Sequence, residues 1–287
     1  MKLLVVSGLS GSGKSIVLQA LEDLDYFCVD NLPISLLLDF SLQMATRKSG
    51  RAITNVAVGI DSRNAEADLS GFRDVMKSIR DQGIETEIVF LEASNSVILK
   101  RFSETRRKHP LSSKAVPLAA AITQERQLLG AIAVDADLRI DTSRSNVHQL
   151  RKIVRERIAQ RASASTSIQL MSFGFKYGVP EDADFVFDLR CLPNPYWDPR
   201  LRSFTGKDVE VVDYLQGEPM VQAMYEDVRV FLDKWLAAFK EDNRSYITIA
   251  LGCTGGQHRS VYLVERLWAY FQLQGEQVLV RHRELVQ

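Results

Sequence analysis

The chain has 287 residues, of which 46% are hydrophobic and 25% are charged, so it can bury a large core and is not a disordered protein. Its 36 basic and 36 acidic side chains cancel, so no overall charge points to a nucleic acid or a membrane as partner. The three cysteines form neither a CxxC pair nor a Cys/His cluster, which argues against a disulfide framework and a structural zinc site. No run reaches the roughly 18 apolar residues of a membrane span, and we expect a cytoplasmic protein.

The first part of the chain alternates between short apolar runs and amphipathic stretches. The runs are typical of strands covered on both faces, and they lie at 3–6, 26–30, 56–61, 87–92 and 138–141. Helical patterns fall between and after them, at 15–24, 66–81, 95–106, 117–132 and 146–160. This alternation predicts a parallel α/β sheet with right-handed crossovers. Together with the glycine-rich segment GLSGSGKS at 8–15, it predicts a P-loop kinase-like domain.

A small polar stretch, RASASTS at 161–167, marks the expected domain boundary. We therefore predict an N-terminal nucleotide-binding domain over 1–162 and a smaller C-terminal α/β domain over 163–287. The second domain has strand candidates at 168–173, 185–190 and 247–251, and helix candidates at 219–240 and 260–274. Its proline-rich loop, LPNPYWDPRLR at 192–202, has the composition of a binding wall.

The segment GLSGSGKS, residues 8–15, matches the phosphate-binding pattern GxxxxGK[ST] between a predicted strand and a predicted helix. Its backbone N–H groups and the helix N-terminus would surround the phosphates of a nucleotide. Lys14 would reach the β- and γ-phosphates, and the Ser15 hydroxyl would bind Mg²⁺. The predicted nucleotide site comprises the whole loop: Gly8, Leu9, Ser10, Gly11, Ser12, Gly13, Lys14 and Ser15.

Magnesium at such a loop usually needs a carboxylate from the end of a neighbouring strand. Asp30 and Asp61 both end predicted strands, and Asp61 is favoured because it ends the longer apolar run. Asp30 could instead orient an attacking water, and a helix cap or a turn residue is the alternative for both. We expect Lys14 and Asp61 to be the residues that support catalysis.

Basic residues cluster after the fourth predicted strand, at Arg101, Arg106, Arg107 and Lys108. Arginines at this place could close over the nucleotide and neutralise the charge that develops in phosphoryl transfer. The segment resembles the arginine-bearing lid of small P-loop kinases, which keeps a small-molecule kinase open as the alternative function. A solvated helix face is the other interpretation.

A second glycine-rich loop, GCTGGQHRS at 252–260, repeats the strand, loop and helix pattern. The hydroxyl of Thr254, the N–H groups of Gly255 and Gly256, and the guanidinium of Arg259 predict a second anion site, and His258 could touch the ligand.

Cys253 lies six residues before Arg259, the spacing of phosphatases that use a cysteine thiolate as nucleophile. Such an enzyme also needs a general acid, for which the proline-rich loop offers Asp198. From the sequence we favour a phosphate-binding cradle over phosphatase chemistry.

These blocks together resemble the RNase adapter protein RapZ family of bacterial P-loop nucleotide-binding proteins. The resemblance spans nearly the whole chain, and its most specific part is the combination of GLSGSGKS with GCTGGQHRSV. The other blocks are VDNLP (29–33), ETRRKHPL (104–111), SFGFKYGVP (172–180), LPNPYWDPRLR and RHREL (281–285).

The resemblance implies Mg²⁺-dependent binding of ATP and GTP with weak hydrolysis. The nucleotide site would include a segment after the third strand, which here is Asp61, Ser62, Arg63 and Asn64. It further implies a C-terminal domain that senses glucosamine-6-phosphate through Thr254, Gly255 and Arg259, beside Cys253, Gly256 and His258. The loop around Tyr196 would form the sugar wall.

Enterobacterial members bind a small regulatory RNA and present it to ribonuclease E, and members of the family are multimeric. The implied partners are therefore an RNA, a ribonuclease and further copies of the chain. RNA-binding members end in a strongly basic tail, whereas this sequence offers Arg281, His282 and Arg283, followed by Glu284. Because phosphate contacts dominate RNA affinity, we expect these three residues to bind RNA weakly.

Overall fold

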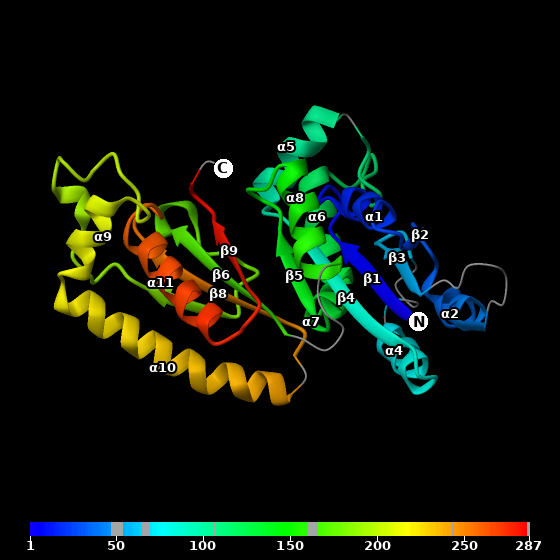
Figure 1. The fold of residues 1–287 in the computed structure, drawn as a ribbon. Helices are drawn as coiled ribbons and strands as arrows, with labels where there is room; N and C mark the ends of the chain where they lie inside the picture. Colours follow the sequence, from blue (N-terminus) through cyan, green and yellow to red (C-terminus); the bar gives the residue numbers. More distant parts are fainter. Residues whose placement is uncertain are drawn as a thin grey trace. The chain divides into compact units, whose positions relative to one another are not determined.

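The computed structural model describes residues 1–46, 54–64, 69, 71–105, 107–159, 166–242 and 244–285. The chain divides into two compact units, residues 1–160 and 161–287, which are described separately. Each unit has one parallel sheet with helices packed on it (Figure 1). The predicted fold class, a P-loop kinase-like sheet domain followed by a smaller α/β domain, is confirmed.

The first sheet has five parallel strands in the order β2-β3-β1-β4-β5. They are β1 (Lys2–Gly8), β2 (Phe27–Val29), β3 (Asn55–Ile60), β4 (Glu85–Glu92) and β5 (Leu138–Asp141). Every residue of β1 after Lys2 is buried, which explains its continuous apolar run. Ser7 lies between Ile60 and Phe90, so the carboxyl ends of β3, β1 and β4 meet at one edge.

Helices cover both faces of this sheet. Helices α1 and α8 contact each other, and α1 packs on β1. Leu3 and Val5 of β1 form a core on the other face with Leu37 and Phe72, from α2 and α4. The helical elements are α1 (Lys14–Glu22), η1 (Ile34–Leu36), α2 (Leu37–Thr46), α4 (Phe72–Asp81), α5 (Asn95–Thr105), α6 (Leu118–Leu128), α7 (Gly130–Val134), α8 (Val147–Val154) and the π-helix η2 (Arg155–Ala159).

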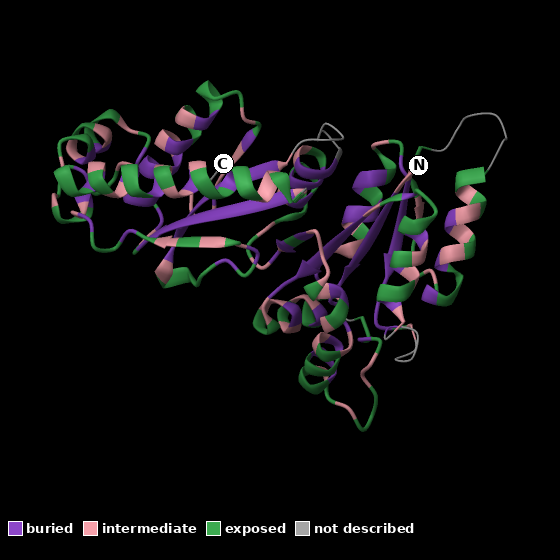
Figure 2. Cartoon of the chain, turned by 90° about the horizontal axis from the view of Figure 1, so that it is seen from below, coloured by how far each residue is buried: buried purple, intermediate pink, exposed green. Residues whose placement is uncertain are grey.

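The second sheet has four parallel strands in the order β7-β8-β6-β9. They are β6 (Ser167–Gly174), β7 (Phe185–Asp188), β8 (Tyr246–Cys253) and β9 (Val278–His282). Its helical elements are η3 (Phe175–Tyr177), η4 (Pro195–Trp197), α9 (Val209–Gln216), α10 (Pro219–Glu241) and α11 (Arg259–Leu273). The central strands β6 and β8 are fully buried, whereas the edge strand β7 is partly exposed, and the helices have exposed outer faces (Figure 2). Within the described ranges, no helix is both long and apolar enough to cross a bilayer.

Several elements differ from the prediction. The helix expected over 117–132 is two helices, α6 and α7, joined at Leu129, and the helix expected to end at 160 becomes π-helical at Arg155. Neither α2 nor β9 was predicted. Three consecutive leucines obscure the period of α2, and β9 depends on pairing with β6, whose Ile168 lies beside Val278.

Candidate functional site

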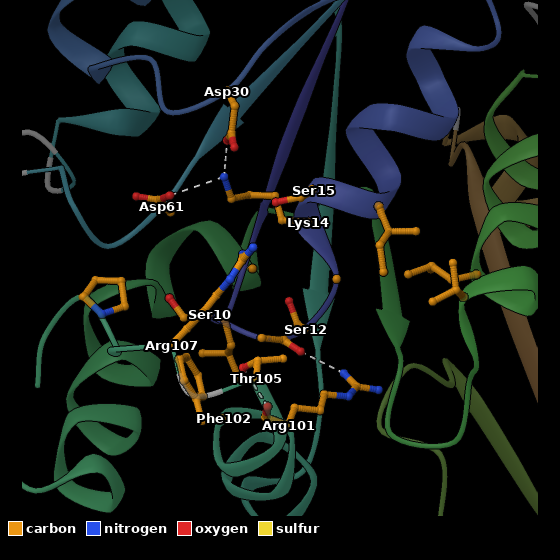
Figure 3. Close-up of a pocket in the computed structure, with 18 of the residues that line it drawn as sticks. Ser10, Ser12, Lys14, Ser15, Asp30, Asp61, Arg101, Phe102, Thr105 and Arg107 are labelled. Atoms are coloured by element: carbon orange, nitrogen blue, oxygen red, sulfur yellow. Dashed lines mark hydrogen bonds and ion pairs between the residues drawn. The ribbon is translucent and has the colours of Figure 1, made fainter.

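A cavity of about 870 Å³ lies at the carboxyl edge of the first sheet. The whole loop 8–15, between β1 and α1, lines it. Asp30 and Asp61, directly after β2 and β3, line the same cavity, together with Arg63, Arg101 and Arg107 (Figure 3). Lys108 also lines it, whereas Arg106 lies outside the described residues. Parallel strands thus bring side chains from distant segments to one edge, where such sheets usually bind ligands.

Side chains outside the phosphate loop donate hydrogen bonds to two of its carbonyl groups. Arg101 Nη1 donates to Gly11 O at 2.9 Å, and Thr142 Oγ1 donates to Ser12 O at 2.8 Å. Gly13 has a φ of +108°, and a Cβ there would lie 2.8 Å from Leu150 of α8, so only glycine fits. With its carbonyls bonded outward, the loop can turn N–H groups towards an anion.

Lys14 contacts both predicted carboxylates. Its Nζ is ion-paired with Asp30 and lies 3.3 Å from Asp61 Oδ2 (Figure 3). Arg63 Nη2 donates to the same Asp61 oxygen at 2.6 Å. Burial raises the pKa of Asp61, but the hydrogen bonds from Arg63 and the charge of Lys14 outweigh it and hold the pKa below its usual value. Asp61 is therefore an ionised carboxylate beside the phosphate loop.

These residues fit a Mg²⁺ site that the nucleotide would complete. Among the described residues, no group of three or more His, Cys, Asp or Glu is arranged to hold a metal ion by itself. Magnesium bound with a nucleotide needs fewer protein ligands, because phosphates and water supply the rest. Ser15 is exposed at the start of α1 and offers its hydroxyl, and Asp61 offers its carboxylate.

The side chains of Ser62 and Asn64, unlike those of Asp61 and Arg63, bond to other parts of the protein. The Ser62 hydroxyl donates to Glu125 Oε1 at 2.6 Å, and Asn64 Oδ1 accepts the N–H of Ile34 at 2.9 Å. Neither lines the cavity. Their side chains fix the loop after β3, which positions Asp61.

A fully buried carboxylate, Glu125 of α6, anchors the phosphate loop and was missed in the sequence. It accepts hydrogen bonds from Ser10 N at 2.9 Å, Ser10 Oγ at 2.7 Å and Ser62 Oγ. His109 Nε2 lies 3.1 Å from Glu125 Oε2, while its Nδ1 accepts the N–H of Leu111 at 3.1 Å. Because Nδ1 accepts a hydrogen bond, Nε2 is the nitrogen of His109 that donates to Glu125.

The signal for Glu125 is its place on the predicted helix. Ala121 and Ile122 lie four and three residues earlier and are buried, so Glu125 falls on the same face. A charged residue on the apolar face of a helix indicates a buried polar partner. His109 lies in an irregular segment and has no comparable signal.

The second unit holds Arg259 at the start of α11, directly after the second loop. Arg259 is 2% exposed, and its Nη1 donates to three backbone carbonyls, those of Leu189 (3.4 Å), Arg190 (3.1 Å) and Leu192 (2.8 Å). Its Nη2 has a long bond of 3.3 Å to Thr254 Oγ1. Its Nε is buried without a partner.

On the edge of the Arg259 guanidinium formed by Nε and Nη2, Nε has no partner and Nη2 has only the long bond to Thr254. Arg63 uses that edge to grip the carboxylate of Asp61. A planar fork of this kind matches the oxygens of a carboxylate or phosphate. Because Nη2 reaches Thr254, this edge of the Arg259 guanidinium faces the second loop.

The other predicted residues of this loop lie around Arg259. Gly256 has a φ of +73°, which favours glycine, and Lys176 N donates to Thr254 O at 3.2 Å. His258 precedes α11, is 6% exposed and has an unpartnered Nε2. Burial lowers the pKa of His258, so the ring is neutral at pH 7. Tyr196 is exposed on η4, where the Arg202 guanidinium lies over its ring.

Two of the three residues expected to bind RNA are engaged inside the domain. His282 Nδ1 lies 2.8 Å from Ser172 Oγ, and its Nε2 lies 2.7 Å from Glu265 Oε1. Arg283 has a 5% exposed side chain and donates to Glu284 and to Gly178 O. Arg281 is partly buried on β9.

Comparisons with known proteins agree on one family. A family model described as the RapZ-like N-terminal domain matches residues 1–162, and one described as the RapZ C-terminal domain matches 166–286. A nucleotide-binding protein of Thioalkalivibrio sulfidiphilus is 55% identical, and one of Nitrosococcus oceani is 54% identical; each match covers 99% of this chain and 100% of the relative.

A solved structure, the shikimate kinase of Bacteroides thetaiotaomicron, matches 53% of this chain and 94% of its own at 13% identity and a TM-score of 0.35. A likeness this low adds nothing to the fold, which rests on the strand order described above.

Proposed function

The chain belongs to the RapZ family of nucleotide-binding proteins, and we propose that its first unit binds ATP or GTP with Mg²⁺ and hydrolyses it slowly. The observation that carries the proposal is the cavity of about 870 Å³, lined by a complete phosphate loop, Lys14 and Asp61. Two relatives, 55% and 54% identical to this chain, are named as nucleotide-binding proteins, which supports the same site.

Each residue would act through its charge or its hydrogen bonds. Loop N–H groups and Lys14 would bind the phosphates, and Ser15 and Asp61 would hold Mg²⁺, which neutralises charge on the transferred phosphoryl group. Arg63 and Lys14 must first release Asp61, because both contact it without ligand. Asp30 could orient water only after leaving Lys14, which supports slow turnover.

A direct test compares nucleotide binding in Lys14→Ala with a matched control, Lys100→Ala. Lys100 is exposed on α5 and absent from the cavity lining. We expect Lys14→Ala to weaken ATP and GTP binding at least tenfold, since a charge-assisted bond contributes about 1.5–3 kcal/mol. Equal affinity in the two variants would contradict the assignment. Turnover that rises many-fold with a metabolite acceptor would instead identify a small-molecule kinase.

We further propose that the second loop binds a sugar phosphate, with glucosamine-6-phosphate as the first candidate. The specific observation is the buried, unpartnered Nε of Arg259 beside Thr254, Gly255 and Gly256. Tyr196 and His258 would line the part of the site that holds the sugar. Calorimetry with glucosamine-6-phosphate should give binding that Arg259→Ala abolishes and exposed Arg200→Ala retains; binding unchanged in Arg259→Ala would contradict the proposal.

The proposed output is an RNA that the protein presents to a ribonuclease as a homo-oligomer. Family membership supports this role, and the engagement of His282 and Arg283 within the domain implies weak RNA contacts. Crosslinking in cells followed by sequencing of bound RNA tests it. Recovery of no specific RNA would point to a protein partner instead.

A further inference from the structure

The thiol of Cys253 lies inside the second phosphate loop, where binding an anion does not require it. Cys253 ends β8 and is 2% exposed. Its Sγ accepts the N–H of Gly256 at 3.2 Å and lies 3.2 Å from Ser260 Oγ. We propose that Cys253 is a nucleophile that takes a phosphoryl group from a ligand in this loop, which makes the C-terminal unit a cysteine-dependent phosphatase.

The surroundings of Cys253 stabilise a thiolate. Burial raises the pKa of Cys253, but hydrogen bonds from Ser260 and Gly256 and the charge of Arg259 outweigh it and lower the pKa below its usual value. Cys28 is the contrasting case, because burial and Glu22 raise its pKa to about 11 and its thiol faces the carbonyl of Leu18. Only the thiolate form is an effective nucleophile.

Arg259 provides the second, independent sign of a reactive site. Its Nη1 is committed to three carbonyls and its Nη2 has only a long bond to Thr254, so the buried Nε is left without a partner beside the loop that contains Cys253. The edge formed by Nε and Nη2 can stabilise the extra negative charge of a five-coordinate transition state. The loop therefore combines a nucleophile with an electrophilic group six residues later.

Two candidate general acids, Asp188 beside Gly252 in the sheet and Asp198 in the proline-rich loop, bear on the class of substrate. The hydrogen bond and charge of Arg200 lower the pKa of Asp198 to about 2, and Arg190 lowers the pKa of Asp188 in the same way. Each carboxylate is paired with an arginine two residues later, Asp188 with Arg190 at 2.7 Å and Asp198 with Arg200 at 2.8 Å, so neither is placed as a proton donor to a leaving group. The favoured substrates thus have leaving groups that depart as stable anions, as acyl and aryl phosphates do. An alkyl phosphate such as a sugar 6-phosphate would bind without turnover and inhibit.

The reaction then balances in two displacements. The Cys253 thiolate attacks phosphorus, the S–P bond forms, and the P–O bond breaks with its electron pair leaving on the carboxylate or phenolate. Water attacks the phosphocysteine, the S–P bond breaks to regenerate the thiolate, and the water proton leaves with the phosphate or to solvent. No metal or redox partner takes part.

The experiment measures hydrolysis of acetyl phosphate and 4-nitrophenyl phosphate by the full chain in EDTA, which suppresses metal-dependent turnover at the first loop. We expect Cys253→Ser to lose activity at least 100-fold. Cys191→Ser, which changes an exposed cysteine, and Lys100→Ala, at an exposed position on α5, should retain activity. Acid quenching should trap one phosphoryl group on the peptide that contains Cys253.

Parallel calorimetry with glucosamine-6-phosphate separates this inference from the proposed ligand. Cys253→Ser should still bind the sugar phosphate, because serine preserves the loop. Sugar-phosphate binding without hydrolysis, or hydrolysis that persists in Cys253→Ser, would overturn the nucleophile and leave the cradle. Hydrolysis that depends on Cys253 without sugar-phosphate binding would support the nucleophile and overturn the ligand.

Discussion

The two phosphate loops have the same local architecture but different ways of holding their cation. Lys14 of the first loop contacts the carboxylates of Asp30 and Asp61. Arg259 of the second donates to backbone carbonyls and keeps one edge free. The first cation must therefore exchange partners when a ligand binds, whereas the second is already oriented. The same strand–loop–helix element thus holds its cation in two different ways.

We expect the largest effect from a substitution that strains the second loop alone. A Cβ at Gly256 would lie 2.5 Å from Glu284 Cγ and 2.6 Å from Gly174 N, at a φ of +73°. We expect Gly256→Ala to lower the unfolding free energy by about 3 kcal/mol. At Gly255 the nearest atom would be Lys176 Nζ at 4.0 Å, so Gly255→Ala should be nearly neutral.

Tryptophan fluorescence in urea isolates this effect, because all three tryptophans, Trp197, Trp235 and Trp268, lie in the second unit. Equal midpoints for the two alanine variants would show that the backbone conformation at Gly256 costs alanine nothing. Nucleotide binding by the first loop should be unchanged in both.

Removal of Mg²⁺ should separate the loops by ligand. With EDTA we expect ATP affinity to fall about 100-fold, equivalent to about 2.7 kcal/mol, because Asp61 then faces the phosphates without a cation between them. Orthophosphate binding at Arg259 should not change. Calorimetry of both ligands with and without Mg²⁺ measures the difference, and a parallel loss at both loops would remove the distinction between them.

The third prediction concerns how the first loop is anchored. Glu125→Ala leaves the buried N–H of Ser10 and the donors of Ser62 and His109 without an acceptor, at a cost of about 2 kcal/mol. Glu125→Gln should cost less, because its oxygen can serve Ser10 N and His109 while the serine hydroxyls rotate to accept its amide.

Circular dichroism in urea and ATP titration measure this anchoring. Glu104→Ala, at an exposed position on α5, is the control. If Glu125→Ala kept both wild-type stability and wild-type ATP affinity, Glu125 would have no role in positioning the loop.

The smallest effect is a pH dependence in the second unit. Burial lowers the pKa of His282, whose ring contacts Ser172 and Glu265 and experiences the charge of Lys207. The unfolded chain therefore binds the proton more readily, with a pKa near 6.5. The contribution of His282 to the free energy of unfolding is present above about pH 6.5 and is lost as the pH falls through the folded pKa. We expect this loss to be less than about 1 kcal/mol.

Tryptophan-detected unfolding between pH 5 and 8 measures this slope. His282→Gln should reduce it, and the remainder should come from buried His258, whose pKa is lowered in the same direction. His148→Gln, on the exposed surface of α8, should leave it unchanged. A slope that is the same in all three proteins would exclude His282 as its source.

The sequence predicted the features that depend on residues close together in the chain. The fold class and family are confirmed, and the residues of GLSGSGKS lie together in one cavity because they are contiguous in the chain. The role of Glu125 depends on a partner, Ser10, that lies 115 residues away, and the clamp on Arg259 uses carbonyls about 70 residues earlier. No local pattern encodes such pairings.

The same limit applies to the residues that were predicted from the family resemblance. Asp61 and Arg63 line the cavity, while Ser62 and Asn64, adjacent in sequence, bond to Glu125 and Ile34. His282 and Arg283 belong to a strand end whose side chains pair with the domain itself. A linear motif gives the neighbourhood of a site, but tertiary contacts decide which side chains face the ligand.

The grip of three carbonyls on Arg259 has an entropic consequence. An arginine that orders only when a ligand arrives loses up to about 2 kcal/mol of rotamer freedom at that moment. Here that loss has already occurred during folding, so a weakly attracted anion can still be recognised by its geometry. Lysine could not replace this residue, because one ammonium cannot hold the carbonyls and still present a planar pair of donors.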